Sequence, residues 1–240
     1  MIYAIGDIHG QYRLLAPILD HLRDVPLMDS DEAVFIGDYI DRGEDSPRVI
    51  DSLIEFGVEF PNTVFLRGNH EQMMLDSRDD PEPLTDLAPG RIAFSNVTLN
   101  WLENGGADTL RSYDIPDYSQ WWDYIPKRHW DFIEATRLEY VTGDYFFVHA
   151  GLLPPGETWE GEPYGLDPRI WIREPFLDSE HVFEGRTVIF GHTPQKTGQP
   201  LVQPNKIGID TAAAYGGPLT LVALNAKIID EPVFWQVQPA

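Results

Sequence analysis

The sequence contains no cysteine in its 240 residues, which excludes disulfides, thiolate metal sites and a cysteine nucleophile. It also lacks long apolar runs, because none approaches the roughly 20 residues that a bilayer-spanning helix requires. The chain opens with the apolar run Met1–Ile5 and reaches a polar motif at Gly6, which leaves no room for a signal peptide. By default, these absences predict a cytoplasmic protein with no membrane partner.

Basic residues are scarce as well. There are 17 Lys and Arg against 39 Asp and Glu, which gives a formal net charge of −22 and an isoelectric point near 4.4. A field of this sign repels nucleic acid and anionic membranes, so neither is expected as a partner. It also repels phosphorylated substrates unless a local positive charge reverses the sign, and bound divalent metal ions do this.

The length suits one domain over residues 1–240, and short apolar runs recur along it. The predicted buried strands are Ile2–Ile5, Ala33–Ile36, Thr63–Leu66, Tyr145–Val148 and Thr187–Phe190. Apolar residues at helical spacing predict one helix over Tyr12–Leu22 and another capped by Ser46, with Pro47 at its first position. Strands and helices alternating in this way predict an α/β fold with a largely parallel central part.

The pattern changes between about Asp76 and Tyr140, a stretch rich in tryptophan. It predicts helices and loops without clear strands, and we interpret it as an insertion beside the functional site. The remaining predicted strands are Lys206–Ile209, Leu219–Leu224, Lys227–Ile229 and Val233–Val237. A short hairpin is expected to turn at Asn225-Ala226.

Polar clusters follow the predicted strands at their carboxyl ends, where open α/β sheets place ligand sites. These clusters are Gly6–Gly10, Gly37–Gly43, Arg67–Glu71, His149–Gly151 and Gly191–Thr193. A single loop Asp after a strand usually caps only a turn. All five clusters, however, combine Asp, Asn or His with Gly, which lets the backbone bend tightly around an ion. Together they predict a metal site.

These clusters resemble the motifs of metal-dependent serine/threonine protein phosphatases, within the wider metallophosphoesterases, and especially those of small bacterial members. The resemblance runs from Asp7 to about Tyr215 and includes Asn104–Gly106 and Trp171–Arg173. It implies a β-sandwich core flanked by helices, with the stretch 76–140 inserted. The ligands that it implies are Asp7, His9 and Asp38 for one metal ion, and Asp38, Asn69, His149 and His192 for a second.

The donor types support this ligand set independently. Carboxylate, carboxamide and imidazole donors without thiolate suit Mn²⁺, Fe or Zn²⁺, of which Mn²⁺ is expected first. A shared carboxylate holds two ions about 3.5–4 Å apart, and such a pair lowers the pKa of a bridging water from about 15.7 towards 7. The resulting hydroxide attacks phosphorus in line.

The resemblance also implies how the other reacting groups are handled. His70 would protonate the leaving group and Asp41 would orient it, while Arg42 and Arg173 would clamp the phosphate. Alternatives remain for three of them. His70 could be a further metal ligand or a packed residue, and Asp41 a turn carboxylate paired with Arg42. Arg173 could form a surface ion pair with Glu174 or Asp178.

One position departs from the family pattern. The chain has Asp210-Thr211-Ala212-Ala213 where members usually carry Asp-Thr-Gly-Ala. The departure removes the conformational freedom of a glycine from the loop before Tyr215, but it changes no predicted metal ligand.

The leading hypothesis is a phosphomonoesterase acting on phosphoserine or phosphothreonine in proteins. Its rival is a symmetrical dinucleoside polyphosphate hydrolase, acting on diadenosine tetraphosphate, and an alternative of another class is an inactive metal-bound binding module. A hydrolase of dinucleoside polyphosphates needs cationic side chains for the extra phosphates of its substrate. The insertion supplies few, namely Arg78, Arg91, Arg111, Lys127, Arg128 and Arg137. The net charge further predicts an acidic rim and a preference for substrates with neutral or basic flanks.

Overall fold

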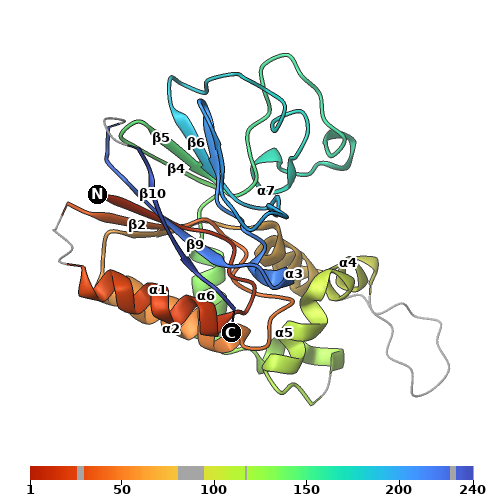
Figure 1. Ribbon diagram of the computed structural model, residues 1–240. Helices are drawn as coiled ribbons and strands as arrows, with labels where there is room; N and C mark the ends of the chain where they lie inside the picture. The colour runs from red at the N-terminus through yellow and green to blue at the C-terminus, as the bar shows by residue number, and fades with distance from the viewer. Residues whose placement is uncertain (26–29, 81–94, 117, 228–230, 240) are drawn as a thin grey trace.

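The computed structural model describes residues 1–25, 30–80, 95–116, 118–227 and 231–239 (Figure 1). Two five-stranded sheets form its core, with strand orders β10-β9-β1-β2-β3 and β4-β5-β6-β8-β7. The first sheet contains β1 (Ile2–Ile5), β2 (Glu32–Phe35), β3 (Thr63–Phe65), β9 (Leu219–Leu224) and β10 (Val233–Val237). The second contains β4 (Glu139–Thr142), β5 (Tyr145–Val148), β6 (Thr187–Phe190), β7 (Leu201–Gln203) and β8 (Lys206–Gly208).

Both sheets are mixed. Strands β1, β2 and β3 run parallel, as do β5, β6 and β8, whereas β4, β7, β9 and β10 pair antiparallel with their neighbours. In the parallel parts, successive strands end at one edge of each sheet. The polar loops that follow them are therefore brought to the same end of the molecule.

The two sheets pack face to face as a sandwich. Side chains alternate along a strand, so in β1 Ile2 and Ala4 join the apolar layer shared with Phe147 of the other sheet. Tyr3 and Ile5 point the opposite way, into the cluster formed with the helices. Because β1 is buried on both faces, its sequence is apolar without interruption.

Helices cover the outer face of the first sheet. In Figure 1, α1 (Tyr12–Asp24) and α2 (Ser46–Glu59) lie side by side below that sheet, and the second sheet lies above it. The other helices are α3 (Asn69–Asp79), α4 (Asn96–Trp101), α5 (Ala107–Ser112), α6 (Lys127–Ala135) and α7 (Pro168–Trp171). A π-helical turn joins α4 to α5 at Leu102–Gly106, and short 3₁₀ turns cover Tyr118–Tyr124, Glu162–Tyr164 and Ala213–Tyr215. Within the described ranges, no helix is long and apolar enough to cross a membrane.

Most predicted elements are confirmed, and β1, β5, β6, β9 and β10 have the predicted bounds. Three details are wrong. Ser46 lies inside α2, whose N-cap is Asp45, because the Ser46 hydroxyl turns inward to lie 3.2 Å from Thr109 Oγ1. The hairpin joins β9 to β10, whereas Lys227 lies outside any strand and residues 228–230 lie outside the described residues. The stretch 76–140 was predicted to contain no clear strand, but its end belongs to β4, which begins at Glu139. Residues 81–94 of this stretch lie outside the described residues.

The departure at Ala212 has a structural consequence. Ala212 adopts a left-handed backbone conformation, with φ 67° and ψ 35°, immediately before the turn Ala213–Tyr215. An L-residue with a Cβ pays about 1–2 kcal/mol for this conformation, whereas glycine adopts it freely. The loop therefore keeps the shape that glycine favours although alanine occupies the position.

We predict that Ala212→Gly raises the free energy of unfolding by about 0.5–1 kcal/mol, since relief of the strain exceeds the entropy that glycine adds to the unfolded chain. Chemical denaturation measures the change. The matched control is Ala213→Gly, one residue further on, where the side chain is buried and φ is not positive. That variant should be destabilised, and equal changes in the two variants would contradict the interpretation.

Candidate active site

The polar loops after the parallel strands converge on one buried carboxylate. Asp38, which follows β2, belongs to two groups of side chains whose ligand atoms lie within 4.8 Å of one another. Its Oδ2 lies 3.4 Å from His9 Nε2, and its Oδ1 lies 3.4 Å from His149 Nε2. The two groups are His9, Asp38 and His70, and Asp38, His149 and His192. Asp38 therefore occupies the position that a bridging ligand requires.

The remaining two predicted ligands lie beside these groups. Asn69 Oδ1 lies 3.2 Å from His149 Nε2 and 2.9 Å from His192 Nδ1, so the amide belongs to the second group. Asp7 lies in neither group of three, but its Oδ2 accepts a hydrogen bond of 2.9 Å from the backbone of His192. The structure thus brings the predicted ligands together and places Asp7 at the margin.

The donor set fits divalent metal ions. Asp7 Oδ1 and His192 Nε2 are buried and have no hydrogen-bond partner among the described residues, as expected of atoms that face an ion. His9 Nδ1 lies 3.0 Å from the carbonyl oxygen of Ile40, and His149 Nδ1 lies 2.8 Å from that of Ile36. A proton on Nδ1 makes both bonds and leaves each Nε2 free to bind metal.

Glycines give the ligand carboxylates room. A Cβ on Gly68 would lie 2.0 Å from Asp38 Oδ1, and one on Gly191 would lie 2.0 Å from Asp7 Oδ1. Any side chain at either position would displace a predicted ligand. This explains why glycine recurs in the polar clusters.

The backbone of the site is strained at several non-glycine residues. Positive φ angles occur at His9 (47°), Asp38 (53°), Asp41 (72°), Arg42 (67°) and His192 (61°). Such conformations persist only where the surrounding structure imposes them, and they concentrate at functional sites.

Burial and neighbouring charge shift the titration of the site. Burial raises the pKa of Asp7, and the nearby carboxylate of Asp210 raises it further. Burial lowers the pKa of His149, but Asp38, Asp7 and the hydrogen bond to Ile36 together outweigh it and raise the pKa to about 10. Despite burial, the surrounding histidines hold the pKa of Asp38 well below its usual range. An ionised Asp7 is therefore unfavourable here unless a cation lies beside it, and a bound metal ion would supply that charge.

His70 and Asp41 form a hydrogen-bonded pair beside the shared carboxylate. His70 Nδ1 lies 2.7 Å from Asp41 Oδ2, and His70 Nε2 lies 3.9 Å from Asp38 Oδ2. Burial lowers the pKa of His70, but Asp38 and Asp41 outweigh it and raise the pKa overall. The Asp41 carboxylate contacts His70 rather than Arg42, so the geometry favours an orienting carboxylate over a simple turn residue.

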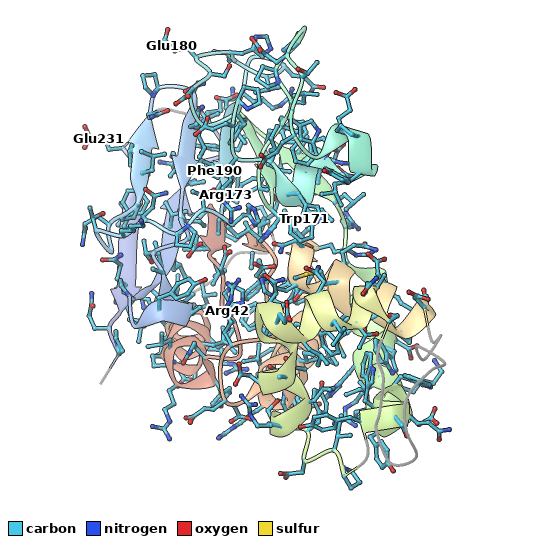
Figure 2. The ribbon with its side chains drawn as sticks, turned by 90° about the vertical axis from the view of Figure 1, so that its right-hand side faces the viewer. Arg42, Trp171, Arg173, Glu180, Phe190 and Glu231 are labelled. Carbon is cyan, nitrogen blue, oxygen red and sulfur yellow. The ribbon has the colours of Figure 1, made fainter. Side chains whose placement is uncertain are left out.

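The two arginines approach the site from different parts of the fold. Figure 2 shows Arg173 above Arg42. Arg42 Nη1 lies 2.8 Å from His9 Nε2, and its guanidinium lies 5.3 Å from the ring centroid of Tyr215. Arg173 Nη2 donates a 3.3 Å hydrogen bond to the carbonyl of His192. No carboxylate of the described chain lies within 4 Å of Arg173, so the alternative surface ion pair is absent there.

Two residues of the insertion hold Asp41, and the sequence alone did not single them out. Thr109 Oγ1 donates to Asp41 Oδ1 at 2.6 Å and accepts from the Asp41 backbone N–H at 2.9 Å. Trp101 Nε1 donates to Asp41 Oδ2 at 3.0 Å. Trp101 lies three residues before Asn104–Gly106, the motif that marked this segment, and this proximity was the available signal.

Glu71 ties two of the site loops together. Its buried carboxylate accepts hydrogen bonds from the backbone N–H groups of Asp38 at 2.9 Å, Tyr39 at 2.8 Å and Gly68 at 2.9 Å. Burial and the Asp38 charge raise the pKa of Glu71 to about 7. This carboxylate fixes the shared ligand relative to the loop that carries Asn69 and His70.

A sandwich of two mixed sheets with Asp, Asn and His at the ends of its parallel strands defines a metallophosphoesterase. The chain belongs to the calcineurin-like phosphoesterase family, whose pattern matches residues 1–204. Members of this family use a dinuclear centre of divalent metal ions.

The chain is also similar to individual phosphatases and to a tetraphosphatase. Serine/threonine-protein phosphatase 1 of Salmonella typhimurium is 29% identical over 235 residues, which cover 93% of this chain and 91% of that protein. A symmetrical bis(5'-nucleosyl)-tetraphosphatase of Nitrosospira multiformis is 29% identical over 154 residues, which cover 64% of this chain and 44% of that protein. A solved serine/threonine phosphatase from Saccharomyces cerevisiae aligns with a TM-score of 0.58 at 17% identity, covering 100% of this chain and 80% of that one. This last likeness shows the fold alone.

We predict that Thr109→Val lowers kcat for alkyl phosphates roughly tenfold, because Asp41 loses the hydroxyl that orients it towards His70. The loss should be smaller for nitrophenyl phosphate, whose leaving group departs without a proton. Steady-state kinetics on both esters measure the difference. Thr98→Val is the matched control, since Thr98 is also a buried threonine of the insertion but is bonded to Ser77 and not to Asp41. A similar loss in both variants would indicate a merely structural role.

Proposed function

We propose that this phosphoesterase hydrolyses phosphate monoesters, with phosphoserine and phosphothreonine of proteins as its substrates. The observation that carries the proposal is the position of Asp38, shared between two groups of ligand side chains and adjacent to the hydrogen-bonded pair His70–Asp41. The Salmonella serine/threonine-protein phosphatase, which matches over nearly its whole length, supports the substrate class.

The chain's residues have separate parts in this reaction. Asp7, His9 and Asp38 would hold one ion, and Asp38, Asn69, His149 and His192 a second, with Mn²⁺ preferred over Fe or Zn²⁺. When bound, such ions activate water and neutralise phosphoryl charge.

The other four residues act on the substrate directly or through a neighbour. Arg42 and Arg173 bind the phosphoryl oxygens with their guanidinium groups. His70 holds a proton at Nε2 for the departing oxygen, and Asp41 keeps the imidazole in position at Nδ1.

The rival substrate, a dinucleoside polyphosphate, finds little support in the insertion. Arg78 pairs with Glu134, Arg111 with Asp108, Lys127 with Asp131 and Arg128 with Asp51. Cations already paired with carboxylates offer little to additional phosphates. The inactive binding module is also disfavoured, since the histidine for proton delivery and every predicted ligand position are present.

A substrate panel tests the proposal. Purified protein with Mn²⁺ should turn over phosphoserine and phosphothreonine peptides with higher kcat/KM than diadenosine tetraphosphate or cyclic nucleotides. A higher kcat/KM for diadenosine tetraphosphate would replace the proposed function with its rival.

The metal assignment predicts two divalent ions per chain and complete loss of turnover on chelation, restored by Mn²⁺. Asp38→Asn should weaken the binding of both ions, because Asp38 belongs to both groups, whereas His192→Gln should weaken only one. Elemental analysis and calorimetric titration count the ions in each variant. Full activity with one ion or none is the result that contradicts the assignment.

If His70 donates the proton, the effect of its substitution on kcat should depend on the leaving group of the ester. His70→Asn should lower kcat for alkyl phosphates by about 10²–10⁴-fold while metal content is retained, with a smaller loss for nitrophenyl phosphate. His181→Asn, a change to an exposed histidine remote from the predicted ligands, serves as the control. Equal losses on alkyl and nitrophenyl esters would argue against proton donation by His70.

A further inference from the structure

A cavity of about 830 Å³ opens beside the candidate active site. Its wall combines Arg173, residues 193, 194 and 196–199, residues 211, 212 and 215–218, and Gln238. None of the residues that line it is Asp or Glu, although the chain carries 39 acidic residues. This wall is therefore an exception on a strongly anionic protein.

The charge of the cavity wall is positive. Arg173 and Lys196 both line it. Many cations elsewhere are paired with carboxylates, as Arg169 is with Asp167, but Lys196 has no carboxylate within 4 Å in the part of the chain that the structure describes. Its charge is thus available to a ligand, and it acts locally because salt screens the acidic surface beyond about 8 Å.

An unpaired hydroxyl points to the same ligand chemistry. Thr193 lines the cavity, and its Oγ1 is buried with no hydrogen-bond partner among the described residues. A buried hydroxyl without a partner is unfavourable, and an anionic oxygen in the cavity would accept a hydrogen bond from it once the Thr193 side chain turns towards the ligand.

The cavity is continuous with the phosphate site. Arg173 lines the cavity and also donates to the carbonyl of His192, and Thr193 directly follows that residue. On the other side, the lining residue Tyr215 stacks under the Arg42 guanidinium. The volume lies within the range of ligand pockets and exceeds what a single phosphate fills. A part of the substrate next to the reacting phosphate therefore reaches it.

We propose that this cavity binds a second anionic group of the substrate, carried by a residue close to the phosphorylated one. The group is an acidic side chain or a second phosphate, which share the same oxygen-acceptor chemistry. This inference rests on the proposed phosphoprotein phosphatase function. It departs from the expectation of neutral or basic flanks, which came from the net charge alone, because no Asp or Glu lines this cavity.

Matched phosphopeptides test the subsite. Peptides with one phosphothreonine carry Glu, Gln or phosphoserine at each flanking position in turn, and kcat/KM is measured for wild type, Lys196→Ala and Lys196→Glu. At the preferred position, the kcat/KM of the Glu peptide is divided by that of the Gln peptide, and the kcat/KM of the phosphoserine peptide likewise. Lys196→Ala should reduce both ratios by about threefold to tenfold. Lys196→Glu should reverse the preference towards a basic flank. The wild-type ratios should also fall as salt rises, whereas those of Lys196→Ala should change little.

Lys127→Ala is the matched control, since Lys127 is exposed on α6 and paired with Asp131. It should leave the ratios unchanged. Ratios that are equal in wild type and Lys196→Ala at every flanking position would overturn the subsite. If only the phosphoserine ratio responds, the ligand is a second phosphate; if both respond, acidic side chains also bind.

Failure of the proposed function is distinguishable from failure of the subsite. If no peptide is hydrolysed and diadenosine tetraphosphate turnover depends on Lys196, the cavity binds a second phosphate and the protein phosphatase function fails. If nitrophenyl phosphate is hydrolysed but no peptide is, inhibition of that reaction decides the subsite. Pyrophosphate should then inhibit more strongly than phosphate in wild type, with a smaller margin in Lys196→Ala, and an unchanged margin overturns the subsite.

Discussion

Buried negative charge is the constraint on which the rest of the site depends. The five carboxylates concerned are Asp7, Asp38, Asp41, Glu71 and Asp210. Ionised groups in a protein interior need compensating partners, and three of these carboxylates each find a different kind. Backbone N–H groups satisfy Glu71, side chains of the insertion and one histidine satisfy Asp41, and histidines surround Asp38. Burial keeps the pKa of Asp7 raised and brings that of Asp210 to about 6, so these two carboxylates lack the compensating charge that a bound cation would supply.

The sandwich fold explains why these charges can be held together. Asp38 follows a strand of the first sheet, whereas His149 and His192 follow strands of the second. Their approach to within 4.8 Å requires the two sheets to be packed against each other. The apolar layer between them, which includes Val34 and Phe147, therefore determines the separation of the ligands as well as stability. Left-handed backbone at the ends of the strands then turns the side chains inward.

The sequence predicted the parallel strands well, and most of the ligand residues that it proposed lie close together in the fold, because both depend on local signals: apolar runs buried on both faces, and Asp, Asn or His beside Gly. It did not predict β4 or β7, which are edge strands with exposed polar positions and no such run. The sequence did not identify Trp101 and Thr109 as functional, because they contact Asp41 from 60 and 68 residues away along the chain. A tryptophan or threonine in a helical segment is also typical of an ordinary core position. Net charge likewise could not show that one cavity wall lacks carboxylates.

The core and the insertion contribute different residues to the site, so substitutions in the two parts should have different effects. The predicted metal ligands lie in loops that follow the core strands and at the start of α3, while α4 and α5 supply the contacts that fix Asp41 and, through it, His70. Under the proposed function, metal binding and the positioning of the proton donor would therefore depend on different parts of the fold. A change in the insertion can alter the leaving groups that the enzyme accepts without disturbing its ions, whereas a change between the sheets affects both, because Asp38 contacts the acid and the ligands alike.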